Sequence, residues 1–387
     1  MVFPSGCKLR SVPAFLAAAL LAFCFVTPSQ AFETQAEEAI LMDAESGTVL
    51  WAKNGFEPMP PASMSKLMTL TLLFEAIKDG QVSLEDEFTV SENAWRTGGP
   101  ASGSSTMFLE PNSTVKVADL IKGIVIQSGN DACIVVAENL AGSVSAFADR
   151  MNERAEELGL EHSHFVNPTG WPDPEQYMSP ADLATLSRHI IYDLPDFYSV
   201  FKEREFTYNG ISQRNRNPLI YRDPTVDGLK TGHTEAAGYG LTASAKRGKE
   251  RLIMVVNGLP SETARANEGD RLLNWGFREF QPYVVSDGKT PIVRADVWQG
   301  TTSSVPLVSK EPVNLLLSPD QSRELTAELV YEEPLAAPLE VGQEVGVMRL
   351  SAPGMPAREL PLTVGEAVER QGFLGRAFSA LGQLIFE

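Results

Sequence analysis

The residue pair with the clearest chemical potential is Ser63 and Lys66, a hydroxyl and an amine three positions apart. Two prolines precede the serine and a long apolar run follows the lysine, an order typical of the start of a helix. Positions i and i+3 lie on one helix face, so the amine could remove the proton of a nucleophilic hydroxyl. The same Ser-x-x-Lys spacing occurs at four other serines, Ser5, Ser113, Ser199 and Ser286. The assignment of Ser63 as a nucleophile therefore depends on its surroundings.

Two further motifs follow this pair along the chain. Ser128-Gly129-Asn130 lies in a break between two predicted helices, and Lys230-Thr231-Gly232 lies on a predicted strand. A Ser-x-Asn sequence also occurs at Ser91, whereas Lys-Thr-Gly occurs once. The ordered set of three is similar to the Ser-x-x-Lys, Ser-x-Asn and Lys-Thr-Gly elements of the penicillin-recognising serine enzymes.

Residues around the three motifs narrow this resemblance. They form the segments Asp43-Ala44, Pro61-Ala62, Asp131-Ala132, Asn167-Pro168-Thr169-Gly170, Asn215-Arg216-Asn217, Asp227-Gly228-Leu229 and His233-Thr234. Together they closely resemble the low-molecular-mass D-alanyl-D-alanine carboxypeptidases of peptidase family S11, the penicillin-binding proteins that include penicillin-binding protein 5. The resemblance extends from about residue 35 to the end of the chain.

The resemblance implies a catalytic role for three side chains. Ser63 would attack the carbonyl between two terminal D-alanines and form an acyl-enzyme, with Lys66 as the base. The amine of Lys66 must then be neutral, and burial, the helix N-terminus and nearby Lys230 would each lower its pKa. Ser128 would relay a proton to the leaving amine. The expected activity is a serine-type carboxypeptidase that removes the terminal D-alanine from peptidoglycan stem pentapeptides and that β-lactams inhibit.

The same resemblance implies a substrate-binding set. Asn130 would hold Lys66 and the substrate amide, whereas Lys230 and Thr231 would bind the C-terminal carboxylate. The backbone N–H groups of Ser63 and His233 would form the oxyanion hole. The complete predicted set is Asn130, Lys230, Thr231, Gly232, His233, Arg216 and Arg265.

Three other functions compete with this one. A DD-endopeptidase that cleaves peptidoglycan cross-links differs only in its substrate. A class A β-lactamase shares the motifs but needs a glutamate-activated water, and no glutamate lies in a matching loop. A catalytically inactive peptidoglycan-binding protein would not need intact motifs. Neither Gly-x-Ser-x-Gly nor His-Glu-x-x-His occurs, so we expect no Ser-His-Asp triad, no metal and no cofactor.

The composition and the N-terminus indicate an exported globular protein. The chain has 387 residues, 43% of them hydrophobic, and its net charge of −18 argues against a nucleic-acid partner. Lys8 and Arg10 precede an apolar stretch, and Ser29-Gln30-Ala31 has the small residues of a cleavage site. Residues 1–31 are therefore predicted to be a signal peptide, with an uncleaved anchor as the alternative. The rest of the chain keeps one cysteine, Cys133, which we expect to be buried in a helix.

The hydrophobic patterns predict an α+β catalytic domain over residues 32–281, with an antiparallel sheet covered by helices. Strands are expected at 39–43, 47–52, 206–208, 226–232, 239–245 and 252–257, and helices at 63–80, 117–126, 131–140, 147–158, 180–192 and 267–280. Residues 92–111 are rich in Gly, Ser and Thr and are expected to form a long irregular loop beside the site.

The composition of the chain shifts from about Pro282 onward. Short alternating apolar runs between prolines predict a small β-sandwich domain over residues 282–364. Residues 365–387 are predicted to be an amphipathic helix that anchors the protein at the periplasmic face of the bacterial inner membrane. A terminal helix packed on the β-domain or on a partner is the alternative. The expected partners are stem peptides ending in D-Ala-D-Ala, β-lactam antibiotics and this membrane.

Overall fold

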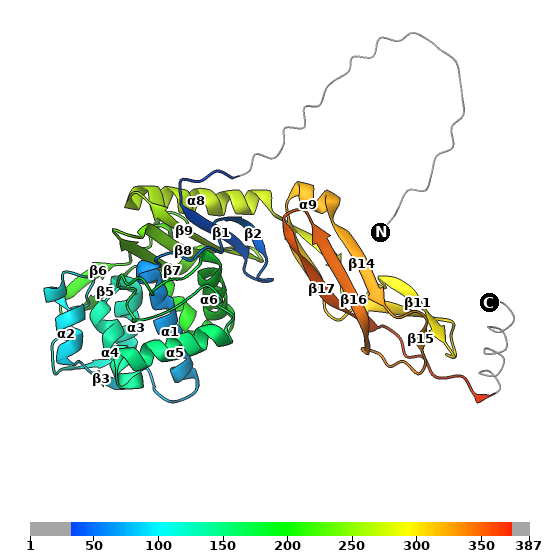
Figure 1. The fold of residues 1–387 in the computed structure, drawn as a ribbon, viewed down its shortest axis with the longest axis horizontal. Coiled ribbons are helices and arrows are strands. Elements are labelled where there is room, and N and C mark those ends of the chain that lie inside the picture. The colour runs from blue at the N-terminus through cyan, green and yellow to red at the C-terminus, as the bar shows by residue number, and fades with distance from the viewer. Residues whose placement is uncertain (1–31, 374–387) are drawn as a thin grey trace, which may run out of the picture. The chain divides into compact units, whose positions relative to one another are not determined.

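The computed structural model describes residues 32–373. The predicted signal peptide and residues 374–387 of the predicted terminal helix lie outside the described residues. Helices and strands are numbered as in Figure 1.

An antiparallel sheet of five strands forms the centre of the catalytic region, in the order β2-β1-β9-β8-β7. Its strands are β1 (Glu38–Asp43), β2 (Val49–Lys53), β7 (Val226–Thr234), β8 (Gly238–Arg247) and β9 (Glu250–Leu259). The strands nearest the two ends of this region lie side by side, because β1 pairs with β9 and Ile40 lies opposite Val255. The predicted hairpin and the consecutive antiparallel strands at 226–232, 239–245 and 252–257 are confirmed. The strand at 206–208, expected to precede them in the same series, instead pairs with residues 211–214 in a separate two-stranded sheet.

Helices cover both faces of this sheet. Ile253 and Val255 of β9 belong to one apolar cluster with residues of α1 (Lys66–Lys78) and α6 (Pro180–Tyr192). On α8 (Glu262–Glu279), Gly269 lies against the methyl group of Met254. Alternate residues of a strand point to opposite faces, which explains why β9 is apolar without alternation.

The remaining secondary structure of the catalytic region supports the site from outside the sheet. It comprises β3 (Glu87–Thr89), α2 (Glu92–Gly98), β4 (Thr114–Lys116), α3 (Val117–Lys122), α4 (Asn130–Ala141), α5 (Val144–Glu157), α7 (Pro195–Tyr198), β5 (Glu205–Tyr208) and β6 (Ile211–Arg214). The predicted helices over 131–140, 147–158 and 180–192 are confirmed as α4, α5 and α6. Among the described residues no single helix is long and apolar enough to cross a bilayer; α4 and α5 qualify only as a pair bent by 83°.

Two further predictions about this region were wrong. The expected loop over 92–111 contains the helix α2, because Ser91 caps it by accepting a hydrogen bond from the N–H of Ala94. Likewise, α8 begins before residue 267, since Ser261 caps it through the N–H of Ala264. The earlier start places Arg265 in the first turn of α8, where it can contribute to the site.

Over residues 281–372 the C-terminal region is all-β apart from the short helix α9 (Pro319–Glu324). Its six-stranded sheet has the order β14-β16-β17-β12-β11-β15, and β10 pairs with β13. The strands are β10 (Gln281–Ser286), β11 (Val293–Trp298), β12 (Ser304–Ser309), β13 (Val313–Leu317), β14 (Thr326–Tyr331), β15 (Leu335–Ala336), β16 (Glu344–Ala352) and β17 (Met355–Val364). Two apolar clusters, around Leu307 and around Leu350, form its core.

The predicted helix over 365–387 does not begin at Gly365. Residues 365–372 are not helical, and Val368 instead makes a β-bridge with Leu339. Val368 is 3% exposed and belongs to the core of the β-region. Its apolar side chain therefore packs in this core and does not form part of the apolar face of a helix. The part of this prediction that covers 374–387 lies outside the described residues.

Candidate active site

Ser63 lies at the entrance to α1, in a short 3-10 turn (Ala62–Ser65) that leads into the helix. Ala62, directly before it, has a φ of 46°, in the left-handed region that residues with a Cβ adopt at a cost of about 1–3 kcal/mol. The serine is half-buried, whereas Lys66 at the start of α1 is fully buried. The sequence therefore predicted the right place, but a tight turn rather than the helix itself presents the hydroxyl.

Two lysines and two serines meet at this turn. Lys66 Nζ lies 2.7 Å from Ser63 Oγ and 3.3 Å from Ser128 Oγ. Lys230 Nζ, from β7, lies 2.9 Å from the same Ser128 Oγ. Residues that are far apart in the sequence thus form one connected hydrogen-bond network, as the three motifs predicted.

Burial lowers the pKa of both amines. The pKa of Lys66 falls to about 8, mainly because burial disfavours the charged form. Burial and repulsion from Lys66 and Arg216 lower the pKa of Lys230 well below its usual value. Within residues 32–373 no carboxylate forms an ion pair with either lysine. Because the two buried amines repel each other and have no counter-ion, the protonation of one affects the other. A state in which one of the two amines is neutral is therefore readily formed.

Ser128 lies at a second strained position. It ends a π-helical turn (Gly123–Gln127) with a φ of 60°, in the left-handed region. This conformation interrupts the helix and directs the Ser128 hydroxyl to both lysines. Strained residues on both sides of the hydroxyl network are typical of a functional site.

Asn130 begins α4 and is 5% exposed. Its Oδ1 atom is buried without a hydrogen-bond partner. No hydrogen bond between Asn130 and Lys66 is found in the described part of the chain, so that predicted contact is not formed here. A buried acceptor without a partner carries an energetic cost and is suited to an N–H group of a ligand.

Strand β7 lies at the edge of the sheet and supplies the third motif. Lys230 and Thr231 are buried, whereas His233 is exposed and its ring lies 3.8 Å from that of Tyr239. A Cβ atom on Gly232 would lie 2.9 Å from the carbonyl oxygen of Pro61. The glycine therefore lets the edge strand lie directly against the turn that carries the serine.

Arg216 and Arg265 line one pocket of about 430 Å³. Arg216 is exposed and donates a hydrogen bond to Ser105 Oγ at 2.5 Å. Arg265 is 5% exposed; its guanidinium lies 3.8 Å from Glu262, and its Nε atom has no hydrogen-bond partner. The structure thus brings together the two arginines that sequence reasoning proposed as carboxylate ligands.

Asp131 supports the site in a role that the sequence did not predict, although Asp131-Ala132 is one of the segments that carry the family resemblance. Its fully buried carboxylate accepts hydrogen bonds from Thr106 Oγ1 and from the backbone N–H groups of Met107, Leu109 and Ala132. Burial raises its pKa, although these hydrogen bonds oppose the rise. Asp131 fixes the 106–109 segment to the start of α4. The available signal was an acidic residue directly after the Ser-x-Asn motif and before an apolar run.

The predicted state of Cys133 is confirmed: it is a free thiol, buried in α4. Burial raises its pKa to about 12, so the thiol stays protonated. Among residues 32–373, no three His, Cys, Asp or Glu side chains gather into a group that could hold a metal ion.

Comparison with known proteins gives two family matches. The peptidase family S11 model, described as D-alanyl-D-alanine carboxypeptidase, matches residues 25–261. The model for the C-terminal domain of penicillin-binding protein 5 matches residues 280–370.

Two individual relatives cover about nine tenths of this chain, and a third covers 64% of it. D-alanyl-D-alanine carboxypeptidase DacC of Escherichia coli is 42% identical over 92% of this chain and 90% of its own length. Penicillin-binding protein 5 of Haemophilus influenzae is 37% identical, with a TM-score of 0.78 over 89% of this chain and all of that one. Penicillin-binding protein D2 of Listeria monocytogenes, solved in an ampicillin-bound form, is 28% identical, with a TM-score of 0.55 over 64% of this chain and 98% of its own.

Proposed function

The chain belongs to the D-alanyl-D-alanine carboxypeptidases of peptidase family S11, and from that premise we propose that it releases the terminal D-alanine through an acyl-enzyme on Ser63. The observation that supports this best is the 2.7 Å distance between Ser63 Oγ and the amine of Lys66, whose pKa is about 8. A base with a pKa near neutrality is suited to removing a hydroxyl proton and returning it later.

In the acylation step, neutral Lys66 takes the proton from Ser63 as its oxygen attacks the carbonyl between the two D-alanines. The C–N bond then breaks, and Ser128 passes a proton to the departing amine of the terminal D-alanine. Ser128 is suited to this relay because both amines lie within hydrogen-bonding distance of its hydroxyl. Attack by water on the ester then releases the shortened peptide and regenerates Ser63.

The negative charge that develops on the oxygen of the tetrahedral intermediate is stabilised by hydrogen-bond donors. We assign these to the backbone N–H groups of Ser63 and His233. The close approach of Gly232 to Pro61 supports this assignment, since it holds β7 against the serine turn. Fixed donors aimed at a developing oxyanion contribute about 3–4 kcal/mol each to transition-state stabilisation.

The substrate carboxylate is proposed to bind Lys230, Thr231, Arg216 and Arg265. The Nε atom of Arg265, buried without a partner, supports a role in binding an anion. Asn130 would accept a hydrogen bond from an amide N–H of the acyl half. Because a β-lactam resembles the D-Ala-D-Ala end, it would acylate the same serine and leave slowly.

Labelling with a fluorescent penicillin tests the nucleophile. Wild type should be labelled covalently and Ser63→Ala should not. Ser113→Ala is the matched control, because Ser113 starts another Ser-x-x-Lys sequence but only donates a hydrogen bond to the carbonyl oxygen of Glu110. Persistent labelling of Ser63→Ala would overturn the assignment.

The DD-endopeptidase remains the competing activity. A muropeptide that ends in D-Ala-D-Ala should release one D-alanine. Cleavage restricted to cross-linked dimers would instead support the endopeptidase.

We further propose that the signal peptide over 1–31 exports the protein and that the C-terminus binds the periplasmic face of the inner membrane. Val368 supports a later start for the anchor than residue 365, because it packs in the β-core. Removal of residues 374–387 should release the protein into the soluble fraction while the β-domain, proposed to begin at residue 282, stays folded. Retention in the membrane fraction would argue against the anchor.

A further inference from the structure

The pocket that contains Arg216 and Arg265, the arginine pocket, holds more positive charge than one carboxylate requires. Four guanidinium groups and a single carboxylate line it in the described structure, those of Arg214, Arg216, Arg222, Arg265 and Glu262. The chain as a whole has a net charge of −18, so the pocket is opposite in charge to the rest of the protein. A concave cluster of like charges attracts ligands of the other sign.

Three of these arginines have no carboxylate partner. Within residues 32–373, neither Arg214 nor Arg216 nor Arg222 forms an ion pair. The guanidinium group of Arg214 lies 4.6 Å from the ring centroid of Tyr221, and Arg222 Nη1 donates a hydrogen bond to Asn267 Oδ1 at 3.0 Å. Both partners are uncharged, so each contact positions a guanidinium group without neutralising it.

The start of α8 adds to the attraction for anions. The N-terminus of this 18-residue helix carries a partial positive charge, and Arg265 lies in its first turn. Arg265 is 5% exposed, and its Nε atom has no hydrogen-bond partner in the described structure. Glu262 lies 3.8 Å from the Arg265 guanidinium, but its side chain is 77% exposed, so solvent weakens this ion pair. A buried donor without a partner therefore faces the same pocket as a helix N-terminus.

We propose that the arginine pocket accepts a leaving residue with a second carboxylate, so that the protein releases D-glutamate from peptides that end in D-Ala-D-Glu. The inference rests on the proposed function, which assigns the α-carboxylate of the leaving residue to Arg216 and Arg265. Arg214 and Arg222 then remain for a carboxylate on the side chain of that residue. Guanidinium groups suit this role, because their paired N–H donors match the two oxygens of a carboxylate. The pocket volume of about 430 Å³ leaves room for a side chain longer than the methyl group of alanine.

Release of D-glutamate needs no reactant beyond water. The C–N bond between D-alanine and D-glutamate breaks as Ser63 is acylated, and the departing amine takes the proton that Ser128 passes on. Water then hydrolyses the ester and regenerates Ser63. The selectivity therefore comes from the contacts of the leaving residue and not from a different reaction.

The test compares three peptides that end in D-glutamate, D-glutamine or D-alanine after Nα,Nε-diacetyl-L-Lys-D-Ala, by kcat/KM for release of the last residue. D-Glutamine has the shape of D-glutamate without its charge, so the ratio of these two values isolates the second carboxylate. Wild type should prefer D-glutamate about 10-fold, as expected for charge-assisted hydrogen bonds to guanidinium groups.

Arg214→Gln and Arg222→Gln should each lower this ratio about threefold, and the double variant should bring it to about 1. Arg204→Gln is the matched control. Arg204 is exposed and also lies over Tyr221, at 5.6 Å from the ring centroid, but it does not line the pocket. Its replacement removes the same charge and should leave the ratio unchanged. An equal fall in Arg204→Gln would show an effect of net charge and would overturn binding in the pocket.

Glu262→Gln should change the ratio in the opposite direction. It removes the carboxylate that repels an acidic side chain in the pocket, so the preference for D-glutamate should rise to about 30-fold. A partly unfolded variant could not produce this increase. A lower ratio in Glu262→Gln than in wild type would contradict the subsite. Labelling with a fluorescent penicillin reports an intact serine site in each variant.

The possible failures can be told apart. A ratio near 1 or below in wild type, or a ratio that neither Arg214→Gln nor Arg222→Gln changes, would overturn the acidic subsite, while release of D-alanine upholds the proposed function. Absence of release from all three peptides would overturn the proposed function, and the subsite with it.

Discussion

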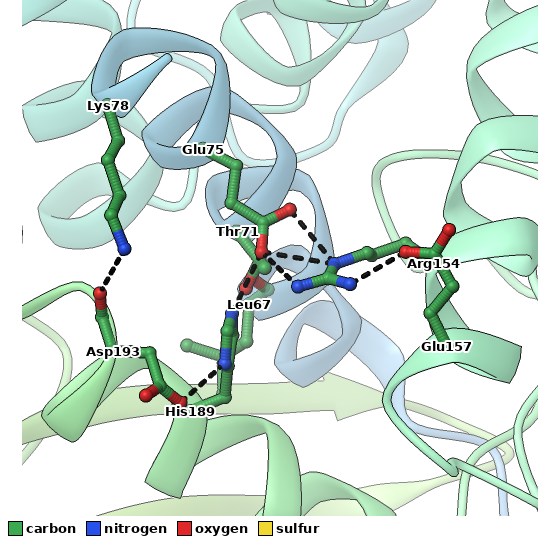
Figure 2. Close-up of polar contacts among 8 residues, drawn as sticks. All are labelled: Leu67, Thr71, Glu75, Lys78, Arg154, Glu157, His189 and Asp193. Atoms are coloured by element: carbon green, nitrogen blue, oxygen red, sulfur yellow. Dashed lines mark hydrogen bonds and ion pairs between the residues drawn. The ribbon is translucent and has the colours of Figure 1, made fainter.

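The helix α1 carries a different ionic cluster at each end. At its start, Lys66 and Lys230 share a hydroxyl and lack a carboxylate partner in the described structure. In its later turns, Glu75 is surrounded by complementary groups from α5 and α6 (Figure 2). Arg154 Nη2 and His189 Nε2 lie 2.7 and 2.8 Å from Glu75 Oε1.

The pKa values follow this difference. Although burial alone would raise the pKa of Glu75, hydrogen bonds from His189 and Arg154 lower it. The hydrogen bond to Glu75 raises the pKa of His189 against the effect of burial, and Asp193 adds to the rise. The Glu75 cluster therefore favours the charged forms of its side chains. At the Lys66 pair, in contrast, burial disfavours the charged forms of both amines.

The comparison teaches how one helix can combine rigidity with reactivity. The Glu75 cluster, formed by Glu75, Arg154, His189 and Asp193, joins α1 to α5 and to α6 with satisfied polar groups (Figure 2). At the start of α1, by contrast, the buried amine of Lys66 lies near that of Lys230 from β7 and beside the strained Ala62, and neither amine forms an ion pair with a carboxylate in the described structure. Charged groups thus contribute stability in the Glu75 cluster and reactivity in the Lys66 pair.

The largest effect is expected for Lys66→Met. Removal of the base should lower kcat for D-alanine release by about 10²–10⁴-fold. Stability should be unchanged or increased, since an apolar side chain of similar length replaces a buried amine without a counter-ion. Activity assays and urea unfolding of the same samples measure both. A large loss of stability would show that Lys66 is a structural residue, contrary to the comparison.

A carboxylate placed near the Lys66 pair should make it resemble the Glu75 cluster. Cys133 lies within electrostatic reach of Lys66 and Lys230, so Cys133→Asp should raise the pKa of Lys66 above about 8. Activity in wild type should rise with pH as Lys66 loses its proton. In the variant this rise should move to higher pH, with about a 10-fold loss at pH 7 per unit of displacement.

Cys133→Asn is the control for that variant, because it adds a polar group of the same shape without charge. Its pH profile should keep the position of the wild-type profile. Equal losses in both variants with no displacement along the pH axis would argue against an electrostatic cause.

The two clusters also differ in how far the sequence predicts them. The spacing of Ser63 and Lys66 and the single Lys-Thr-Gly located the candidate active site, since short motifs have fixed local geometry. The strain at Ala62 and Ser128 was not predictable, because non-glycine residues in that region are stabilised only by tertiary contacts.

The Glu75 cluster has no comparable sequence signal. Glu75, Arg154 and His189 are brought together by the packing of α1, α5 and α6, and each residue alone resembles a solvated charge. Sequence periodicity placed these helices correctly but could not give their relative rotation. The contact between His189 and Glu75 gives His189 a structural role.

Glu75→Gln should lower the free energy of unfolding by about 1–3 kcal/mol, since it leaves Arg154 and His189 partly buried without their carboxylate. Penicillin labelling at 25 °C should stay within about threefold of wild type, because the serine turn does not contact this residue. Glu92→Gln, at an exposed ion pair with Arg96, is the matched control and should change stability by less than about 0.5 kcal/mol. A loss of acylation without a loss of stability would contradict the structural role.

The smallest effect concerns pH. The pKa of His189 is higher in the folded protein than its ordinary value of 6.5, so the folded state binds the proton more tightly. Its contribution is therefore fully present below pH 6.5 and is lost as the pH rises through the raised pKa. Urea unfolding between pH 6 and 9 should show wild type losing more stability than His189→Gln, in which this proton is absent. Parallel curves for the two proteins would show that Glu75 and Arg154 alone carry the stability of the cluster.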